Sequence, residues 1–182
     1  HKNTLAAVAN LATSLEGQGR YAEAEPLRRR ALDGLARVLG AEHPDTLGGM
    51  GNLARVLQSQ AAYGEAEALY RRAYDAQRRI LGENDPSTLA LLSNLAVSTN
   101  SQGRYAEAEA LHRRALAAKE QALGAKDPRT LGTLHNLAEN LVGQGRYPEA
   151  EELYRRAYDG FARVVGPAPH DTLASLDGLA TS

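Results

Sequence analysis

The sequence contains no cysteine and no tryptophan, and its only phenylalanine is Phe161. Without cysteine, the chain has neither a disulfide framework nor a thiolate metal site. The 21 basic and 22 acidic residues nearly balance, so the net charge of -1 provides no attraction for nucleic acid or an anionic membrane. No apolar run approaches the ~20 residues that cross a bilayer, and the start does not resemble a signal peptide. We therefore expect a cytoplasmic protein that binds neither nucleic acid nor membrane.

A repeat of 42 residues runs through the whole chain without insertion or deletion. Internal repeats of this length are typical of solenoid architectures. The register is visible in a threonine-leucine pair, in an Asn-Leu-Ala triplet and in a tyrosine that each return at this spacing. The threonines are Thr4, Thr46, Thr88, Thr130 and Thr172. The repeat predicts one domain, 1–182, with units 1–42, 43–84, 85–126 and 127–168 and a partial capping unit, 169–182. Since His1 to Leu5 already read as the inside of a repeat, we expect the chain to be part of a longer protein.

Each repeat is predicted to form two helices and no strand. The first begins at an Asp-Pro such as Asp85-Pro86, because aspartate caps free amides and proline tolerates the first helical position. It stops at a glycine in repeats 1, 3 and 4, whereas Ala61 takes this place in repeat 2 and should give the least well-formed turn. Helical periodicity places Leu11 and Val38 on apolar faces. Stacked pairs bury these faces in one core, so we predict an all-α, right-handed superhelical solenoid of antiparallel helix pairs with a concave side.

One stretch carries a family resemblance. Gln102-Gly103-Arg104-Tyr105-Ala106-Glu107-Ala108-Glu109, followed by Leu111, Arg113, Arg114 and Ala115, resembles the tetratricopeptide repeat (TPR). The 42-residue length and the Asp-Pro-x-Thr-Leu opening are similar to the kinesin-light-chain variant, whose helices are longer than those of the 34-residue form. The resemblance covers essentially the whole chain. It implies an array that binds a protein or an extended peptide segment.

No catalytic or metal-binding constellation is visible. No two of the five histidines lie three or four residues apart on one helix, and no nucleophile motif or phosphate-binding glycine loop is present. We therefore predict no enzyme activity and no cofactor or metal. Four Glu-x-x-x-Arg pairs, from Glu25-Arg29 to Glu151-Arg155, have the spacing that supports an exposed helix. His112 and the tyrosines at the equivalent position, Tyr70 and Tyr154, are interpreted as packing residues.

A ladder of asparagines is the strongest functional signal in the sequence. Asn10, Asn52, Asn94 and Asn136 recur at one position of the first helix. Asparagine is a mediocre helix former, so its return in every repeat needs a reason. In arrays of the resembling family this helix face lines the concave groove, where an amide can donate to and accept from a peptide backbone. The alternative is that each asparagine bonds a neighbouring repeat and fixes the stacking.

Three other residues are predicted to line the groove beside the ladder. Arg55 is a candidate partner for a ligand carboxylate, whereas His135 and Glu139 give the fourth repeat the opposite sign. The residue four positions before each asparagine is small, and repeat 2 carries several glycines around Gly48. These glycines either let helices approach closely or leave the groove floor open.

The predicted function is a scaffold that binds proteins or peptides through this groove. Two alternatives stay open. The chain could be an architectural spacer, or it could be the sensor arm of a multidomain signalling protein whose active domain lies outside this sequence.

Overall fold

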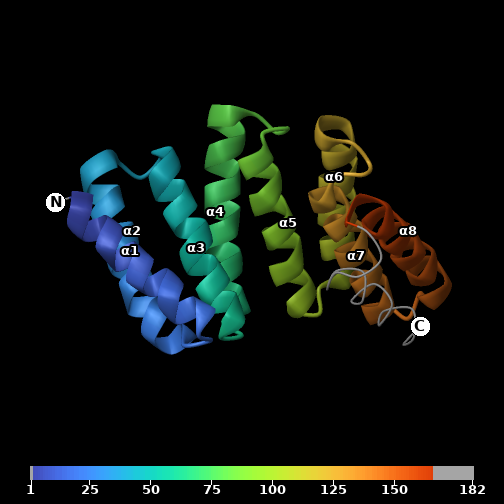
Figure 1. Ribbon diagram of the computed structural model, residues 1–182, viewed down its shortest axis with the longest axis horizontal. Coiled ribbons are helices and arrows are strands. Elements are labelled where there is room, and N and C mark those ends of the chain that lie inside the picture. Colours follow the sequence, from blue (N-terminus) through green and yellow to red (C-terminus); the bar gives the residue numbers. More distant parts are fainter. Residues whose placement is uncertain (1, 166–182) are drawn as a thin grey trace. The chain divides into compact units, whose positions relative to one another are not determined.

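The computed structural model describes residues 2–165, without the side chains of residues 2–5 and 165. This range forms eight α-helices and no strand (Figure 1). The helices are α1 (Lys2–Gly17), α2 (Tyr21–Leu39), α3 (Pro44–Ser59), α4 (Tyr63–Leu81), α5 (Pro86–Ser101), α6 (Tyr105–Leu123), α7 (Pro128–Gly143) and α8 (Tyr147–Val165). The first helices of the four repeats begin at residues 2, 44, 86 and 128, and the predicted start at Asp85-Pro86 is confirmed. The capping segment 169–182 lies outside the described residues.

The first helix of each repeat begins as the sequence predicts. The Asp85 carboxylate accepts a hydrogen bond of 2.9 Å from the Ser87 amide at the start of α5. Asp127 accepts one of the same length from the Arg129 amide at the start of α7. In repeat 2 the cap is His43, whose Nδ1 accepts from the Asp45 amide at 3.1 Å. Each cap satisfies an amide that the helix leaves free, so these starts are set locally.

The turn between the two helices of a repeat requires a left-handed residue. Gly19, Gly103 and Gly145 have φ values of 73°, 74° and 74°. Ala61 takes the same place with φ 61°, and its amide donates to the Gln58 carbonyl at 3.0 Å. The turn of repeat 2 therefore forms the same hydrogen bonds as the others, and the expected weakness appears as backbone strain at Ala61. The hydrogen bonds hold alanine in a conformation that its Cβ disfavours.

Two alanine positions hold each helix pair together. Every repeat has a fully buried alanine at one shared position of its first helix and at one shared position of its second. The first-helix alanines are Ala12, Ala54, Ala96 and Ala138, and the second-helix alanines are Ala24, Ala66, Ala108 and Ala150. A small side chain at each position lets the helix axes approach, and larger leucines and tyrosines fill the space around them.

The helices divide into two compact units, residues 1–83 and 84–182. Unit 1 contains α1 to α4 and therefore repeats 1 and 2. Unit 2 contains α5 to α8 and therefore repeats 3 and 4. Within each unit every helix packs on the next one along the chain.

Two residues placed on apolar faces by periodicity are exposed. Leu11 is 53% exposed, whereas Leu53 and Leu137 at the equivalent position are 2% and 1% exposed. The difference arises because no helix precedes α1 in the described part of the chain. Val38 is 55% exposed, because it lies in the last turn of α2. In the described range no helix is both long enough and apolar enough to span a membrane.

Candidate functional site

The asparagine ladder lies on the surface. Asn10, Asn52 and Asn94 are exposed and Asn136 is half-buried, each on the first helix of its repeat. Within the described residues, none of these four side chains forms a hydrogen bond or an ion pair. No hydrogen bond of these side chains therefore links one repeat to the next among the described residues.

The glycines near Asn52 serve two purposes. A Cβ placed on Gly48 would meet no atom within 4 Å, so this position leaves open space beside the ladder. A Cβ on Gly49 would lie 3.3 Å from Leu35 Cδ1, so Gly49 lets α3 approach α2 closely. Gly132, which corresponds to Gly48 in repeat 4, is also open. Both interpretations of these glycines therefore apply, at different positions.

Arg55 forms a charged cluster with two residues that the sequence analysis did not select. The buried Glu16 carboxylate receives a hydrogen bond from Arg55 and one of 2.5 Å from Arg28 Nε. Arg28 also donates to Thr13 Oγ1 at 2.9 Å. Two guanidinium groups share one carboxylate, so the cluster keeps one excess positive charge. The Arg55 side chain is 51% exposed, which leaves part of its guanidinium facing solvent.

In repeat 4 the predicted groove residues His135 and Glu139 lie together. His135 Nε2 is 3.5 Å from Glu139 Oε1, and the His135 ring meets the edge of Tyr154 at 5.3 Å between centroids. Burial, with a smaller contribution from Glu139, raises the pKa of Tyr154 to about 12. The Glu139 side chain is 55% exposed, so this end of unit 2 presents a carboxylate.

His112 is a packing residue, as predicted. It is 1% exposed, and neither ring nitrogen has a hydrogen-bond partner among the described residues. Burial is the main reason that the pKa of His112 falls to about 4. The ring is therefore neutral at physiological pH. Tyr70 and Tyr154 at the equivalent position are buried too.

Lys119 is a buried cation in unit 2. Its Nζ donates to Ser93 Oγ of α5 and Thr133 Oγ1 of α7, both at 2.8 Å, and to the Arg129 carbonyl at 3.3 Å. The three acceptors use all three of its protons, and none of them is a carboxylate. Burial lowers the pKa of Lys119 to about 8, and the nearby Arg129 adds to this effect.

The Glu-Arg pairs of the second helices support their own helix, as predicted, and two of the glutamates also bond the next repeat. Arg29 and Arg113 donate to Glu25 and Glu109 at 2.9 Å. Gln60 donates to the second oxygen of Glu25 at 2.9 Å in unit 1. In unit 2, Gln144 donates to Glu109 over the same distance. The same pair of residue types therefore links consecutive repeats in both units.

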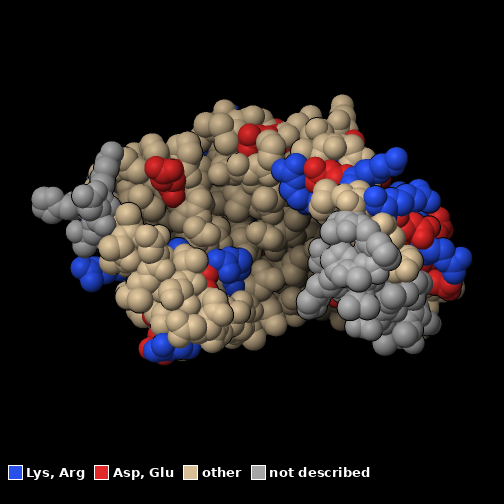
Figure 2. All heavy atoms as spheres, in the orientation of Figure 1, with Lys and Arg blue, Asp and Glu red and all other residues tan. Residues whose placement is uncertain are grey.

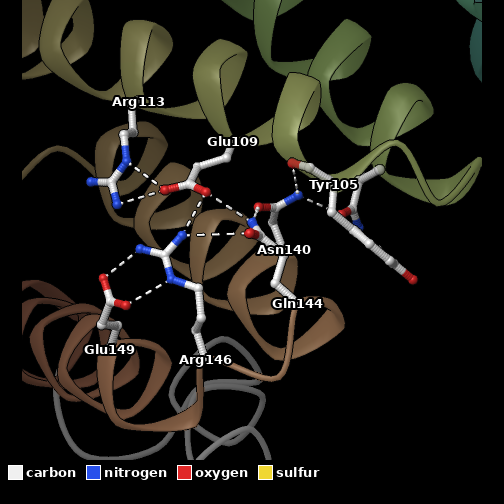
Figure 3. Close-up of polar contacts among 8 residues, drawn as sticks. Tyr105, Glu109, Arg113, Asn140, Gln144, Arg146 and Glu149 are labelled. Atoms are coloured by element: carbon white, nitrogen blue, oxygen red, sulfur yellow. Dashed lines mark hydrogen bonds and ion pairs between the residues drawn. The ribbon is translucent and has the colours of Figure 1, made fainter.

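Unit 2 extends this link into a larger polar network (Figure 3). Arg146 lies between Glu109 and Glu149, with contacts of 2.7 and 2.6 Å. Burial alone would raise the pKa of Glu109, but hydrogen bonds from Gln144, Arg113 and Arg146 together lower it. The fully buried Asn140 donates to Asn100 Oδ1 at 2.8 Å and to the Tyr105 carbonyl at 3.0 Å, and it accepts from Gln144 at 2.8 Å.

The sequence did not identify three residues that form hydrogen-bond networks in the structure: Glu16, Lys119 and Asn140. Each is polar and nearly or fully buried. The repeat gave only a weak signal. Lys119 takes the position of Leu35, Gln77 and Phe161, Asn140 that of Ser14, Val56 and Ser98, and Glu16 that of Gln58, Asn100 and Val142. Each position is polar in at least two repeats, so the repeat pattern alone does not mark these three residues as buried.

On one face, the two units differ in how densely charged side chains cover them. On the face drawn in Figure 2, charged side chains are sparse over α1 to α4, and uncharged residues cover most of that surface. Charged side chains gather over α6 and α8. Among the residues that the structure describes, no three histidine, aspartate or glutamate side chains are grouped as metal ligands.

The comparisons with known proteins agree on one fold. The crystal structure of TPR-like repeats from a candidate kinesin light chain of Podosopora anserina is 28% identical, with a TM-score of 0.82 over 100% of this chain and 86% of that one. BtubC (BKLC) from P. vanneervenii is 26% identical, with a TM-score of 0.78 over 91% of this chain and 66% of that one. A search of curated proteins finds no match.

The match to a family is made repeat by repeat. The sequence model of the tetratricopeptide repeat matches residues 4–79, 49–121, 87–163 and 129–181, which together span nearly the whole chain. The solved relatives are TPR-like repeats of the same helical fold. The predicted all-α, TPR-like fold class is confirmed, and the chain belongs to the tetratricopeptide repeat family.

Proposed function

We propose that this chain is a protein-binding scaffold that holds an extended peptide with the amides of its asparagine ladder. Tetratricopeptide repeats are protein-interaction modules, so the scaffold role follows from the family. The ladder role is supported by one observation above all. Four asparagines at one repeat position are exposed or half-exposed and have no hydrogen-bond partner within the described part of the chain.

The chemistry of an amide side chain suits a peptide backbone. Each asparagine offers two donors and one acceptor, which match the alternating carbonyl and amide groups of an extended strand. An extended peptide advances about 3.3 Å per residue, so successive backbone groups of the ligand can meet the asparagines of a unit in turn.

Charge gives each unit its own preference among ligand residues. A ligand residue that reaches Arg55 should be acidic, because the cluster of Arg28, Arg55 and Glu16 keeps an excess positive charge. One that reaches Glu139 should be basic or neutral. His135 contributes a half-buried ring that positions Glu139 and Tyr154.

The test replaces two asparagines without disturbing the helices. Peptides are selected by panning a phage-displayed random library on the whole chain, and their affinity is measured by fluorescence anisotropy. The double variant Asn52→Ala, Asn94→Ala should keep the wild-type melting temperature or raise it, since alanine is the better helix former. Because two side-chain hydrogen bonds are lost, it should bind about tenfold more weakly.

The control is Asn84→Ala, which removes an exposed asparagine outside the helices. It should bind the selected peptides as the wild type does. If the double variant unfolds while its affinity holds, the ladder stacks the repeats instead. The architectural function would then be the better account.

A further inference from the structure

A hollow in unit 1 adjoins the asparagine ladder. It consists of two neighbouring cavities of about 250 and 270 Å³ that share Ala9, Ala31, Leu35 and Asp45. Their walls come from α1, α2 and α3, and most of the side chains in them are apolar, with Arg28, Asp45 and Asn52 as the polar ones. Asn52 lies at the edge of the second cavity. A peptide held by Asn52 would therefore pass beside an apolar cavity.

Small residues keep this hollow open. Alanines of α1 and α2 line it, and a Cβ on Gly48 would enter open space. In repeat 3 the residue that corresponds to Leu35 is Lys119, whose ammonium is held by Ser93 and Thr133. Each cavity is smaller than the ~300–1,000 Å³ of typical small-molecule pockets. The size suits one large side chain.

A charged residue at the rim of the hollow favours one kind of ligand residue beside the apolar side chain. Asp45 lines both cavities, and its side chain is 70% exposed. Its one side-chain contact among the described residues is His43, at 3.7 Å. Arg28, the other charged residue of the lining, is bonded to Glu16. The rim therefore has an accessible negative charge at Asp45, which a cation of the ligand would complement.

We propose that this hollow binds a leucine-sized apolar side chain of the peptide, and that a neighbouring lysine or arginine of the peptide pairs with Asp45. The inference rests on the proposed function, since the ladder must bring the peptide past the hollow. It adds the ligand's chemistry: one apolar residue with a basic neighbour, bound to unit 1.

The test fills the hollow and leaves the ladder unchanged. Peptides panned from the phage-displayed random library on the wild-type chain should share a leucine, isoleucine, methionine or phenylalanine within two positions of a lysine or arginine. Gly48→Leu should lower their affinity about tenfold or more. Leucine is the better helix former, so the variant should melt no lower than the wild type. Asp45→Asn should lower the affinity about threefold and weaken its salt dependence.

Gly132→Leu is the matched control, because Gly132 is the equivalent open glycine of unit 2. It should leave the affinity for these peptides unchanged. The inference is overturned if Gly48→Leu binds them as tightly as the wild type while Asn52→Ala, Asn94→Ala binds weakly, and the proposed function then survives alone. It is also overturned if the free chain is a dimer that Gly48→Leu dissociates, because a second copy then fills the hollow. Failure to enrich any peptide overturns both proposals.

Discussion

The two units share one backbone plan and differ in what they bury. Val56 of α3 lies in an apolar cluster with Ala12, Leu15 and Ala24. Asn140, two repeats later, takes the same position and is fully buried among hydrogen-bond partners. The comparison shows that a pair of packed helices can bury either an apolar or a polar residue at this position, provided that the buried polar group has hydrogen-bond partners.

The surfaces of the units differ as well. Leu35 lines an open hollow in unit 1, whereas Lys119 reaches Ser93 and Thr133 in unit 2. Arg55 in repeat 2 corresponds to Glu139 in repeat 4, with the opposite charge. The repeating residues fix the backbone, and the residues that break the repeat give each unit its own polar contacts and surface charges.

The largest effect should come from exchanging the two interiors. Val56→Asn places an amide in the apolar cluster without partners and should lower the free energy of unfolding by about 3 kcal/mol. Asn140→Val removes the donor to Asn100 and the Tyr105 carbonyl, and should cost about 1–2 kcal/mol. Urea denaturation followed by circular dichroism measures both.

Val164→Asn is the control for this exchange, because Val164 is 46% exposed. It should change the free energy of unfolding by less than about 0.5 kcal/mol. If Val56→Asn is as mild as this control, the interior of unit 1 is not the closed apolar cluster described here.

Removing the buried charge of unit 2 should give the next largest effect. Lys119→Met should stabilise the chain by about 2 kcal/mol at pH 7, because it removes the desolvation of an ammonium group. Ser93 and Thr133 keep their bonds to the carbonyls of Leu89 and Arg129, so they are not left unpaired. Lys126→Met changes an exposed lysine and should have little effect.

The pH dependence checks the cause. Burial holds the pKa of Lys119 at about 8 in the folded chain, below its ordinary value of 10.5 in the unfolded chain. Between these values the unfolded state binds more protons, so the contribution of Lys119 to stability rises with pH. Below pH 8 both states carry the proton, and the full penalty remains. The unfolding free energy of the wild type, less that of Lys119→Met, should therefore rise from pH 8 to 10.5. If this difference does not change with pH, Lys119 is not a buried charge.

The turn of repeat 2 offers a smaller gain. Ala61 holds φ 61°, where its Cβ is strained, so Ala61→Gly should raise the free energy of unfolding by about 1 kcal/mol. Ala68→Gly, in the exposed middle of α4, should lower it by about 1 kcal/mol. If alanine-to-glycine substitution stabilises the chain at position 61 and destabilises it at position 68, the backbone conformation of Ala61 is the cause. Thermal melts of the two variants decide this.

The smallest effect is the difference between the two links between repeats. Gln60→Ala removes one hydrogen bond to Glu25 and should cost about 0.5 kcal/mol. Gln144→Ala also removes a bond to the buried Asn140 and should cost about 1–1.5 kcal/mol. Equal losses, measured by urea midpoint, would contradict the difference between the two networks.

The sequence predicted the helix boundaries because they depend on local signals that repeat. Asp-Pro starts and left-handed glycine stops act within a few residues, and four copies in register reinforce each other. The sequence also selected the exposed asparagines and the charges at Arg55 and Glu139. It could not supply the partners of Glu16, Lys119 and Asn140, because these partners lie on different helices and depend on packing.

Nuclear magnetic resonance of the asparagine side chains tests the central claim most directly. The side-chain amide signals of Asn10, Asn52, Asn94 and Asn136 are followed while a selected peptide is added to ¹⁵N-labelled chain. The account predicts that signals of this ladder shift on binding, whereas the signal of Asn140, which is already bonded inside unit 2, stays in place. If the peptide binds and the four ladder signals do not move, the asparagines do not hold the ligand and the account is wrong.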